Sequence, residues 1–238
     1  MLPYSISNAA GFRRTLLGSL LCLGCWSASG ETLHYTVNWP SGLSLGEATV
    51  RSDLVNTGSA PDAAKRWDLS AMLDAAIPGF TLRDEYRAES DDKFCSSKLE
   101  KTVIRGSRKS TEKVTFDQAN KIVRRETSAG GKSEYSVPGC VHDALSFLQF
   151  VRQELAQGRL APSQVVVLGA KYDIQLTYTG SEFVKHGDKM VDADRVHVAV
   201  KGPKADVSAD LYFAKDPART PLVARIPLAM GTFSVELE

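Results

Sequence analysis

The stretch Leu33-His-Tyr-Thr-Val-Asn-Trp39 alternates apolar and polar side chains, which places Leu33, Tyr35, Val37 and Trp39 on one face of an extended segment. This period of two is typical of a strand that buries one face of a sheet. The sequence Pro40-Ser-Gly42 then predicts a turn, after which the alternation resumes. The domain is therefore expected to begin with an antiparallel hairpin.

The same alternation recurs along the chain between turn residues, among them Thr179-Gly180. Roughly a dozen short strands favour a mainly β fold, either a single curved antiparallel sheet or an open barrel. The strands are expected at residues 33–39, 46–51, 67–73, 81–89, 95–104, 111–116, 121–127, 132–137, 164–168, 172–178, 191–201, 206–214, 222–228 and 232–237.

One segment, residues 143–155, has a different period. Its apolar residues fall at positions 144, 147, 148, 151 and 155, which is helical spacing. Asp143 is the expected N-cap, because its carboxylate accepts hydrogen bonds from the first free backbone amides. Gly158 is the expected stop. We expect one packed central helix that plugs or covers the curved sheet.

The first thirty residues, 1–30, are typical of a secretion signal. Arginines at 13 and 14 precede a short apolar stretch, and small residues lead up to Gly30. Cleavage is expected between Gly30 and Glu31, which leaves 31–238 as a single β-rich domain. The apolar stretch is shorter than the roughly 20 residues that span a bilayer, and no later segment is long and apolar enough to do so.

Two motifs within this leader offer alternative export routes. The pair Arg13-Arg14 resembles a twin-arginine export signal, although paired arginines also occur in ordinary signals. The sequence Leu23-Gly24-Cys25 resembles the end of a lipoprotein box, and acylation of Cys25 would tether the protein to a membrane. The predicted location is therefore periplasmic or secreted, with a lipid anchor at Cys25 as the alternative.

Four cysteines divide between the leader and the domain. Cys22 and Cys25 leave with the signal, so Cys95 and Cys140 remain. An even number of cysteines in an exported chain predicts a disulfide, here one that ties the helix start to the strand at 95–104. Two separate buried thiols are the alternative. Two isolated cysteines without a nearby histidine pair do not supply a metal site, and we expect neither a metal nor a cofactor.

Composition restricts the classes of partner. The full chain has a net charge of +1, and without the two leader arginines the domain carries 27 basic and 28 acidic residues. A nucleic-acid-binding protein needs a clear excess of Lys and Arg, so no nucleic-acid partner is expected. The hydrophobic fraction of 43% is that of a folded globular chain.

No catalytic motif stands out. There is no Gly-x-Ser-x-Gly elbow and no phosphate-binding glycine loop, so no catalytic residue is assigned and the protein is expected not to be an enzyme. The alternative is an envelope hydrolase that uses His142 with nearby carboxylates, since Asp143 and Ser146 lie close in sequence. The remaining histidines and acidic pairs show no ligand spacing: His34, His186, His197, Asp91-Asp92 and Asp192 with Asp194.

Several ordered features together resemble one bacterial family. They are Tyr35-Thr-Val-Asn-Trp39 followed by Gly46-Glu-Ala, the helix from Asp143 to Arg152, Gly169-x-x-Tyr172, Asp216-Pro-Ala-Arg-Thr-Pro-Leu222 and Gly231-x-Phe233-x-x-Glu236-Leu. The family is the one catalogued as domain of unknown function 3108. The resemblance covers nearly all of the domain and implies an exported location and a mainly β fold. It implies no activity and no site residues.

The sequence thus favours a non-catalytic periplasmic or cell-envelope protein that binds a lipid, a glycan or a protein partner. The large apolar residues Trp39, Trp67, Phe147 and Phe150 are expected in the core. In the alternative interpretation some of them line a site for an acyl chain, because half-open barrels with a helix plug hold lipids. By analogy of fold alone, the curved open sheets of periplasmic lipoprotein carriers are the most similar architecture.

Overall fold

The computed structural model describes residues 30–57, 64–77, 80–203 and 206–238. The predicted signal peptide, including Cys25, lies outside the described residues apart from its last residue, Gly30.

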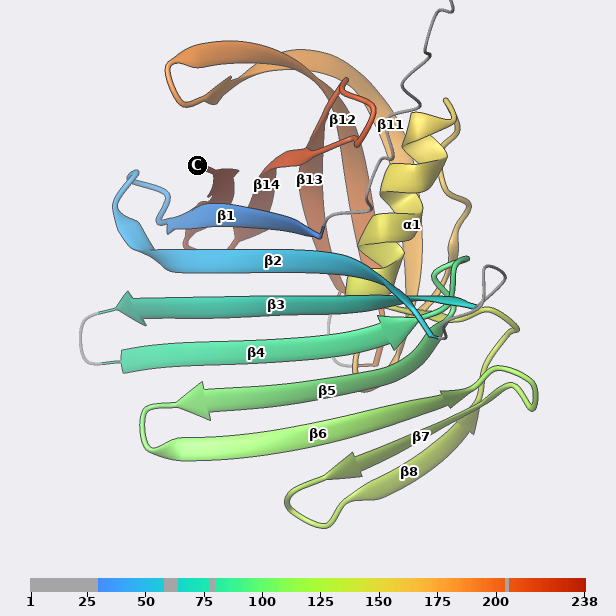
Figure 1. Cartoon of the computed structure of the whole chain (residues 1–238). Helices are drawn as coiled ribbons and strands as arrows, with labels where there is room; N and C mark the ends of the chain where they lie inside the picture. Colours follow the sequence, from blue (N-terminus) through green and yellow to red (C-terminus); the bar gives the residue numbers. More distant parts are fainter. Residues whose placement is uncertain (1–29, 58–63, 78–79, 204–205) are drawn as a thin grey trace, which may run out of the picture.

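The described residues form one sheet of fifteen strands, antiparallel except for the parallel pair β9–β10 (Figure 1). The first half of the chain supplies β1 Glu31–Asn38, β2 Ser44–Asn56, β3 Lys65–Ile77, β4 Phe80–Ser90, β5 Ser96–Arg105, β6 Arg108–Asp117, β7 Ile122–Thr127 and β8 Lys132–Ser136. The second half supplies β9 His142–Asp143, β10 Gln164–Val167, β11 Lys171–His186, β12 Lys189–Lys201, β13 Asp206–Ala214, β14 Pro221–Leu228 and β15 Gly231–Leu237.

The two halves meet at β1, which pairs with β2 on one side and with β15 on the other. The order across the sheet is therefore β8 to β1 followed by β15 to β9. β8 and β9 are the edge strands, and the sheet is not closed into a barrel. A side-chain contact joins β8 to the start of β11, where Lys171 Nζ donates to the carbonyl of Ser136 at 3.3 Å. The expectation of a single curved sheet is confirmed.

The helix α1, Ala144–Ala156, follows β9 directly. Asp143 is its N-cap, as predicted, and accepts hydrogen bonds from the amides of Leu145 and Ser146. Gly158 lies just beyond the helix with a φ of +72°, a conformation that glycine adopts without a steric penalty. The expectation of one packed helix is confirmed for the described part of the chain.

The helix packs against both halves of the sheet. Phe147, Val151 and Leu155 join a buried cluster with strands β10 to β13, whereas Leu145 packs against the cluster of β3 to β7 that includes Leu69 and Leu99. Because one helix contacts the same face of both halves, the sheet curls around it (Figure 1). We call this face the inner wall and the opposite face the outer face.

The helix covers only one end of the inner wall. Ser96 bonds to its N-cap, and Arg152 bonds to Glu31 at the start of β1. We call this the helix end. The turns β1–β2, β5–β6 and β14–β15 lie at the opposite end, which we call the distal end (Figure 1).

The predicted turn at Thr179-Gly180 is wrong. β11 continues to His186, with a bulge between Tyr178 and Gly180. The φ of +120° at Gly180 is accessible to glycine, so the strand bends there instead of ending. Strands β2 and β3 also extend beyond the predicted 46–51 and 67–73, because their backbones pair with each other from Gly46 and Ala75 to Asn56 and Lys65.

The bend lets the β11–β12 hairpin arch over the outer face (Figure 1). A further buried cluster forms between the hairpin and the strands below it, from Val184, Ala193, Tyr212, Ala214, Leu222 and Val223. At the hairpin tip, His186 Nδ1 lies 3.2 Å from the carbonyl of Leu237.

Candidate functional site

The predicted disulfide is present in the structure, where Cys95 and Cys140 are bonded with an S–S distance of 2.00 Å. The bond joins the residue before β5 to the segment before β9, and the backbone bond from Ser96 N to the carbonyl of Val141 lies beside it. It therefore ties the start of the helix to β5, as the sequence predicted.

The N-cap carboxylate of Asp143 is the centre of a buried hydrogen-bond network. Its Oδ1 accepts from the amides of Leu145 at 2.8 Å and Ser146 at 3.2 Å. Its Oδ2 accepts from the hydroxyls of Ser96 at 2.6 Å and Ser146 at 2.7 Å. None of Ser96, Asp143 and Ser146 is exposed to solvent. All four bonds hold the helix start, so Asp143 acts as a structural cap.

His142 is only 2% exposed, and its Nδ1 bonds to Phe94, whereas the hydroxyl of Ser146 bonds to Asp143. The Nδ1 of His142 donates to the carbonyl of Phe94 at 2.6 Å, and its ring stacks on Phe150 at 4.8 Å between centroids. Burial lowers the pKa of His142, against the opposing effects of that hydrogen bond and of the Asp143 charge. The geometry thus gives a neutral, buried imidazole that orients the loop, and does not favour the hydrolase alternative.

The other histidines and acidic pairs are dispersed. His34 lies on β1, His186 at the hairpin tip and His197 on β12. Asp91 caps the turn before Cys95 by accepting from the amides of Lys93 and Cys95. Asp192 and Asp194 pair with Lys215 and Arg219. No cluster of three or more metal-ligating residues occurs in the described ranges.

Between the helix and the distal end, half of the inner wall is entirely apolar. Val37 faces Val235 across the junction of the two halves, and Val50 faces Ala71 on the neighbouring strands. On β14, β15 and β1 to β3, the members of this apolar half are Ala224, Ile226, Phe233, Val235, Val37, Ala48, Val50, Ala71 and Leu73. All nine are partly exposed, and none belongs to a packed core cluster.

The charged side chains of the inner wall gather on β4 to β7. Ala71, Tyr86, Lys101 and Glu112 are successive register partners, so this row leads from the apolar half into the charged half. Asp84 and Arg105 form an ion pair with two hydrogen bonds, and Glu112 pairs with Arg125 at 2.6 Å. The charged half of the inner wall comprises Asp84, Lys101, Arg105, Arg108, Glu112 and Arg125.

The rim of the distal end carries exposed apolar residues on two adjoining turns. Leu43 and Met230 are about two-thirds exposed, at 66% and 67%. The turns touch so closely that a Cβ on Gly231, whose φ is +123°, would lie 2.7 Å from the ring of Pro40. Beneath them, Trp39 packs edge-on against Phe233 at 4.8 Å. The apolar half thus continues to an exposed apolar rim.

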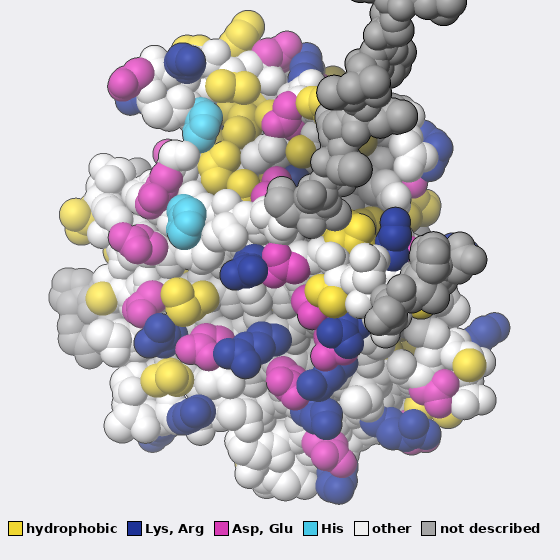
Figure 2. Space-filling model, in the orientation of Figure 1, with side chains coloured by type: hydrophobic (Ala, Val, Ile, Leu, Met, Phe, Trp, Pro, Cys, Tyr) yellow, Lys and Arg dark blue, Asp and Glu magenta, His cyan; other side chains and the backbone are white. Residues whose placement is uncertain are grey.

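Over β2 to β6 the outer face is polar by contrast. Figure 2 shows Lys and Arg alternating with Asp and Glu on these strands. Neighbours pair along it, for example Arg66 with Asp68 and Lys98 with Glu100. Such exposed ion pairs keep the face hydrated and contribute little to stability.

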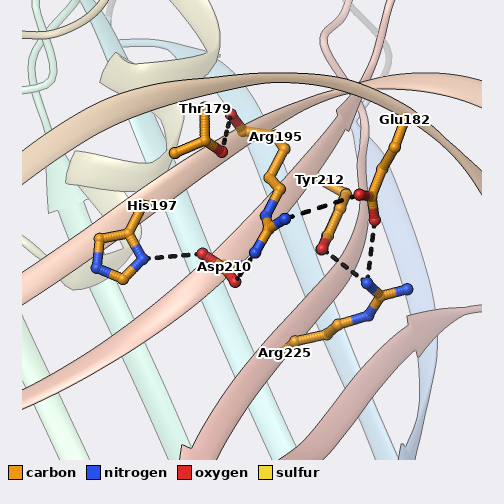
Figure 3. Close-up of polar contacts among 7 residues, drawn as sticks. All are labelled: Thr179, Glu182, Arg195, His197, Asp210, Tyr212 and Arg225. Carbon is orange, nitrogen blue, oxygen red and sulfur yellow. Dashed lines mark hydrogen bonds and ion pairs between the residues drawn. The ribbon is translucent and has the colours of Figure 1, made fainter.

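A polar network lies under the arching hairpin on the outer face of β12 to β14 (Figure 3). Asp210 accepts from Arg195 at 2.6 Å and from His197 at 2.9 Å, and Arg225 donates to Glu182 at 3.0 Å. Burial alone would raise the pKa of Asp210, but the hydrogen bonds from His197 and Arg195 outweigh it and hold the pKa below its ordinary value. Since the charges pair off internally, this network fastens the hairpin to the sheet.

An ion pair next to the predicted cleavage site joins the helix to the first strand. Arg152 of α1, with a side chain 7% exposed, donates to both carboxylate oxygens of Glu31 at 2.6 and 2.9 Å. Its Nε also donates to the carbonyl of Ala218. The sequence did not single out this pair, because a salt bridge between residues so far apart has no local signature.

The fold is one large, curled sheet that wraps around a single helix in the described residues and is not closed into a barrel. The structure is similar to the crystal structure of a β-barrel-like protein of domain of unknown function DUF1849 from Brucella abortus, with a TM-score of 0.57 and 5% identity. The similarity covers 87% of this chain and 94% of that one, and at this identity it shows the fold alone.

The chain itself belongs to the family described as protein of unknown function DUF3108, whose model matches residues 34–238. The suspected family resemblance is therefore confirmed. No curated protein matches the chain. In the described ranges, no helix is long and apolar enough to cross a membrane.

Proposed function

We propose that this protein is a non-catalytic binding protein of the cell envelope, and that it holds a lipid-like ligand against the inner wall of its sheet. One observation carries the proposal: nine apolar side chains of the inner wall are neither packed in a core nor covered by the helix. Partly exposed apolar surface that continues to an exposed apolar rim is what an acyl chain would cover.

The chemistry of this wall favours a lipid over a glycan. A sugar needs hydrogen-bond donors and acceptors beside each hydroxyl, whereas the apolar half supplies only hydrocarbon and one aromatic ring, Phe233. Burying a twelve-carbon chain contributes at most about 9 kcal/mol, from which the cost of association is subtracted. A dissociation constant in the micromolar range is the expected scale.

The test uses two adjacent residues on β3 that face opposite ways. Ala71 lies on the inner wall and Ser70 on the outer face, where its register partners are Arg51 and Arg87. Ala71→Trp should weaken binding of a fluorescent fatty-acid probe about tenfold by filling the wall, whereas Ser70→Trp should leave it unchanged. Thermal melts of both variants report whether each is folded. Absence of binding to the folded unmodified chain, or equal loss in both variants, would reject the proposal.

The envelope location is supported by the leader-like sequence of residues 1–30 and by the Cys95–Cys140 disulfide, a bond that persists in oxidising compartments. The envelope location is tested by expressing the full chain in cells and measuring the mass of the protein recovered from them. A chain that begins at Glu31 indicates a soluble exported protein, and a diacylated chain that begins at Cys25 indicates the anchored alternative. A full-length chain that stays in the cytoplasm would contradict both.

A further inference from the structure

Resting on the proposed function, we propose that the ligand is an anionic amphiphile, and that its acidic head group binds beside Lys101 while its chain lies on the apolar half of the inner wall. The shared head-group chemistry is a carboxylate or a phosphate on an alkyl chain.

Apolar and charged side chains are separated on one continuous inner wall. Every residue of the apolar half is uncharged, whereas the charged half lies on the adjoining strands of the same wall. The row of Ala71, Tyr86 and Lys101 crosses the boundary within three neighbouring strands. Adjacent antiparallel strands are about 4.8 Å apart, so the cation lies roughly 10 Å from the apolar half. That separation suits one amphiphilic molecule.

The charged half of the inner wall keeps a net positive charge after its ion pairs are counted. The charged half holds four cations and two carboxylates, and the carboxylates are taken up by Arg105 and Arg125. Lys101 forms no ion pair with any described residue, and the same is true of Arg108 beside the β5–β6 turn. The wall therefore keeps two uncompensated positive charges. A neutral lipid would leave them unused, and a cationic one would be repelled.

The surroundings of Lys101 leave its ammonium group at the surface of the inner wall. Its side chain is partly buried, and its Nζ lies 5.3 Å from the centre of the Tyr86 ring, a cation–π contact that holds the ammonium group near the wall. Because Lys101 forms no ion pair with a described residue, its ammonium group has hydrogen bonds to give to an anionic oxygen.

The simpler interpretation is a solvated lysine that only packs on Tyr86. The two interpretations differ in what removal of the charge does to ligand binding. Lys113 provides the matched control, because it lies on the outer face of β6, opposite Glu100, and also forms no ion pair with a described residue. Lys101→Gln and Lys113→Gln remove the same charge from opposite faces.

The experiment measures the binding of dodecanoate, dodecyl phosphate and dodecanol at pH 8 to residues 31–238 and to both variants. The unmodified chain should bind the two anions about tenfold more tightly than the alcohol, as one charge-assisted hydrogen bond provides. Lys101→Gln should abolish this preference without changing the affinity for dodecanol, and Lys113→Gln should preserve it. Whichever anion binds more tightly identifies the head group as carboxylate or phosphate.

Three outcomes would overturn the inference. Equal binding of dodecanol and the anions would reject the anionic head group while the proposed lipid function stands. An equal effect of Lys101→Gln and Lys113→Gln would attribute the preference to overall charge. Failure of all three ligands to bind the folded chain would reject the proposed function and the inference together.

Discussion

Replacing Asp143 by Ala tests whether the helix start is held by a single buried carboxylate. The substitution removes all four hydrogen bonds that Asp143 accepts. Loss of the N-cap costs about 1 kcal/mol. The hydroxyls of Ser96 and Ser146 then lack their acceptor in surroundings without solvent, which costs about 1–2 kcal/mol each. The expected loss of unfolding free energy is about 3 kcal/mol, since removal of a buried charge offsets part of the sum.

Urea unfolding of residues 31–238, followed by circular dichroism with the disulfide intact, measures this loss. Asp143→Asn is the matched control, because its side-chain oxygen still accepts from the amides of Leu145 and Ser146. It should lose roughly half as much. A loss below about 1 kcal/mol for Asp143→Ala would show that the network does not hold the helix start, and the structural account of this residue would be wrong.

Two further predictions concern the same region. Replacing Cys95 and Cys140 by Ala, which opens a loop with a sequence separation of 45, should lower the unfolding free energy by about 4 kcal/mol; an unchanged urea midpoint would contradict this. Because burial lowers the pKa of His142, the unfolded chain takes up a proton below about pH 6.5, whereas the folded chain takes it up only at a lower pH. Stability should therefore fall between pH 7 and pH 5, by up to about 1.4 kcal/mol per pH unit, and His142→Asn should flatten this fall.

The predictable part of the structure follows from local patterns. Alternation within the first strand assigned Leu33, Tyr35 and Val37 to one face correctly, and helical spacing with Asp143 as cap located α1. The prediction of a turn at Gly180 was wrong because glycine permits both a turn and a bulge. Only the pairing of β11 with β12 decides between them.

The candidate site itself could not be read from the sequence. Charged residues occur on both faces of β5, for example Glu100 on the outer face and Lys101 on the inner wall, so residue type does not mark the inner face. The position of Lys101 on the inner wall follows from how the sheet curls around the helix, which depends on contacts far apart in the chain. The Glu31–Arg152 pair was missed for the same reason. By contrast, the disulfide was predictable because only two cysteines remained to form it.

Photolabelling tests the central claim most directly. A fatty acid with a diazirine in its chain would be bound to residues 31–238, irradiated, and located by peptide mass spectrometry. Binding at the inner wall predicts labels on Val37, Leu73 and Ile226, and competition by dodecanoate. Labels confined to outer-face residues such as Ser70, or to the exposed hairpin residues Phe183 and Met190, would contradict the assignment of the inner wall as the ligand site.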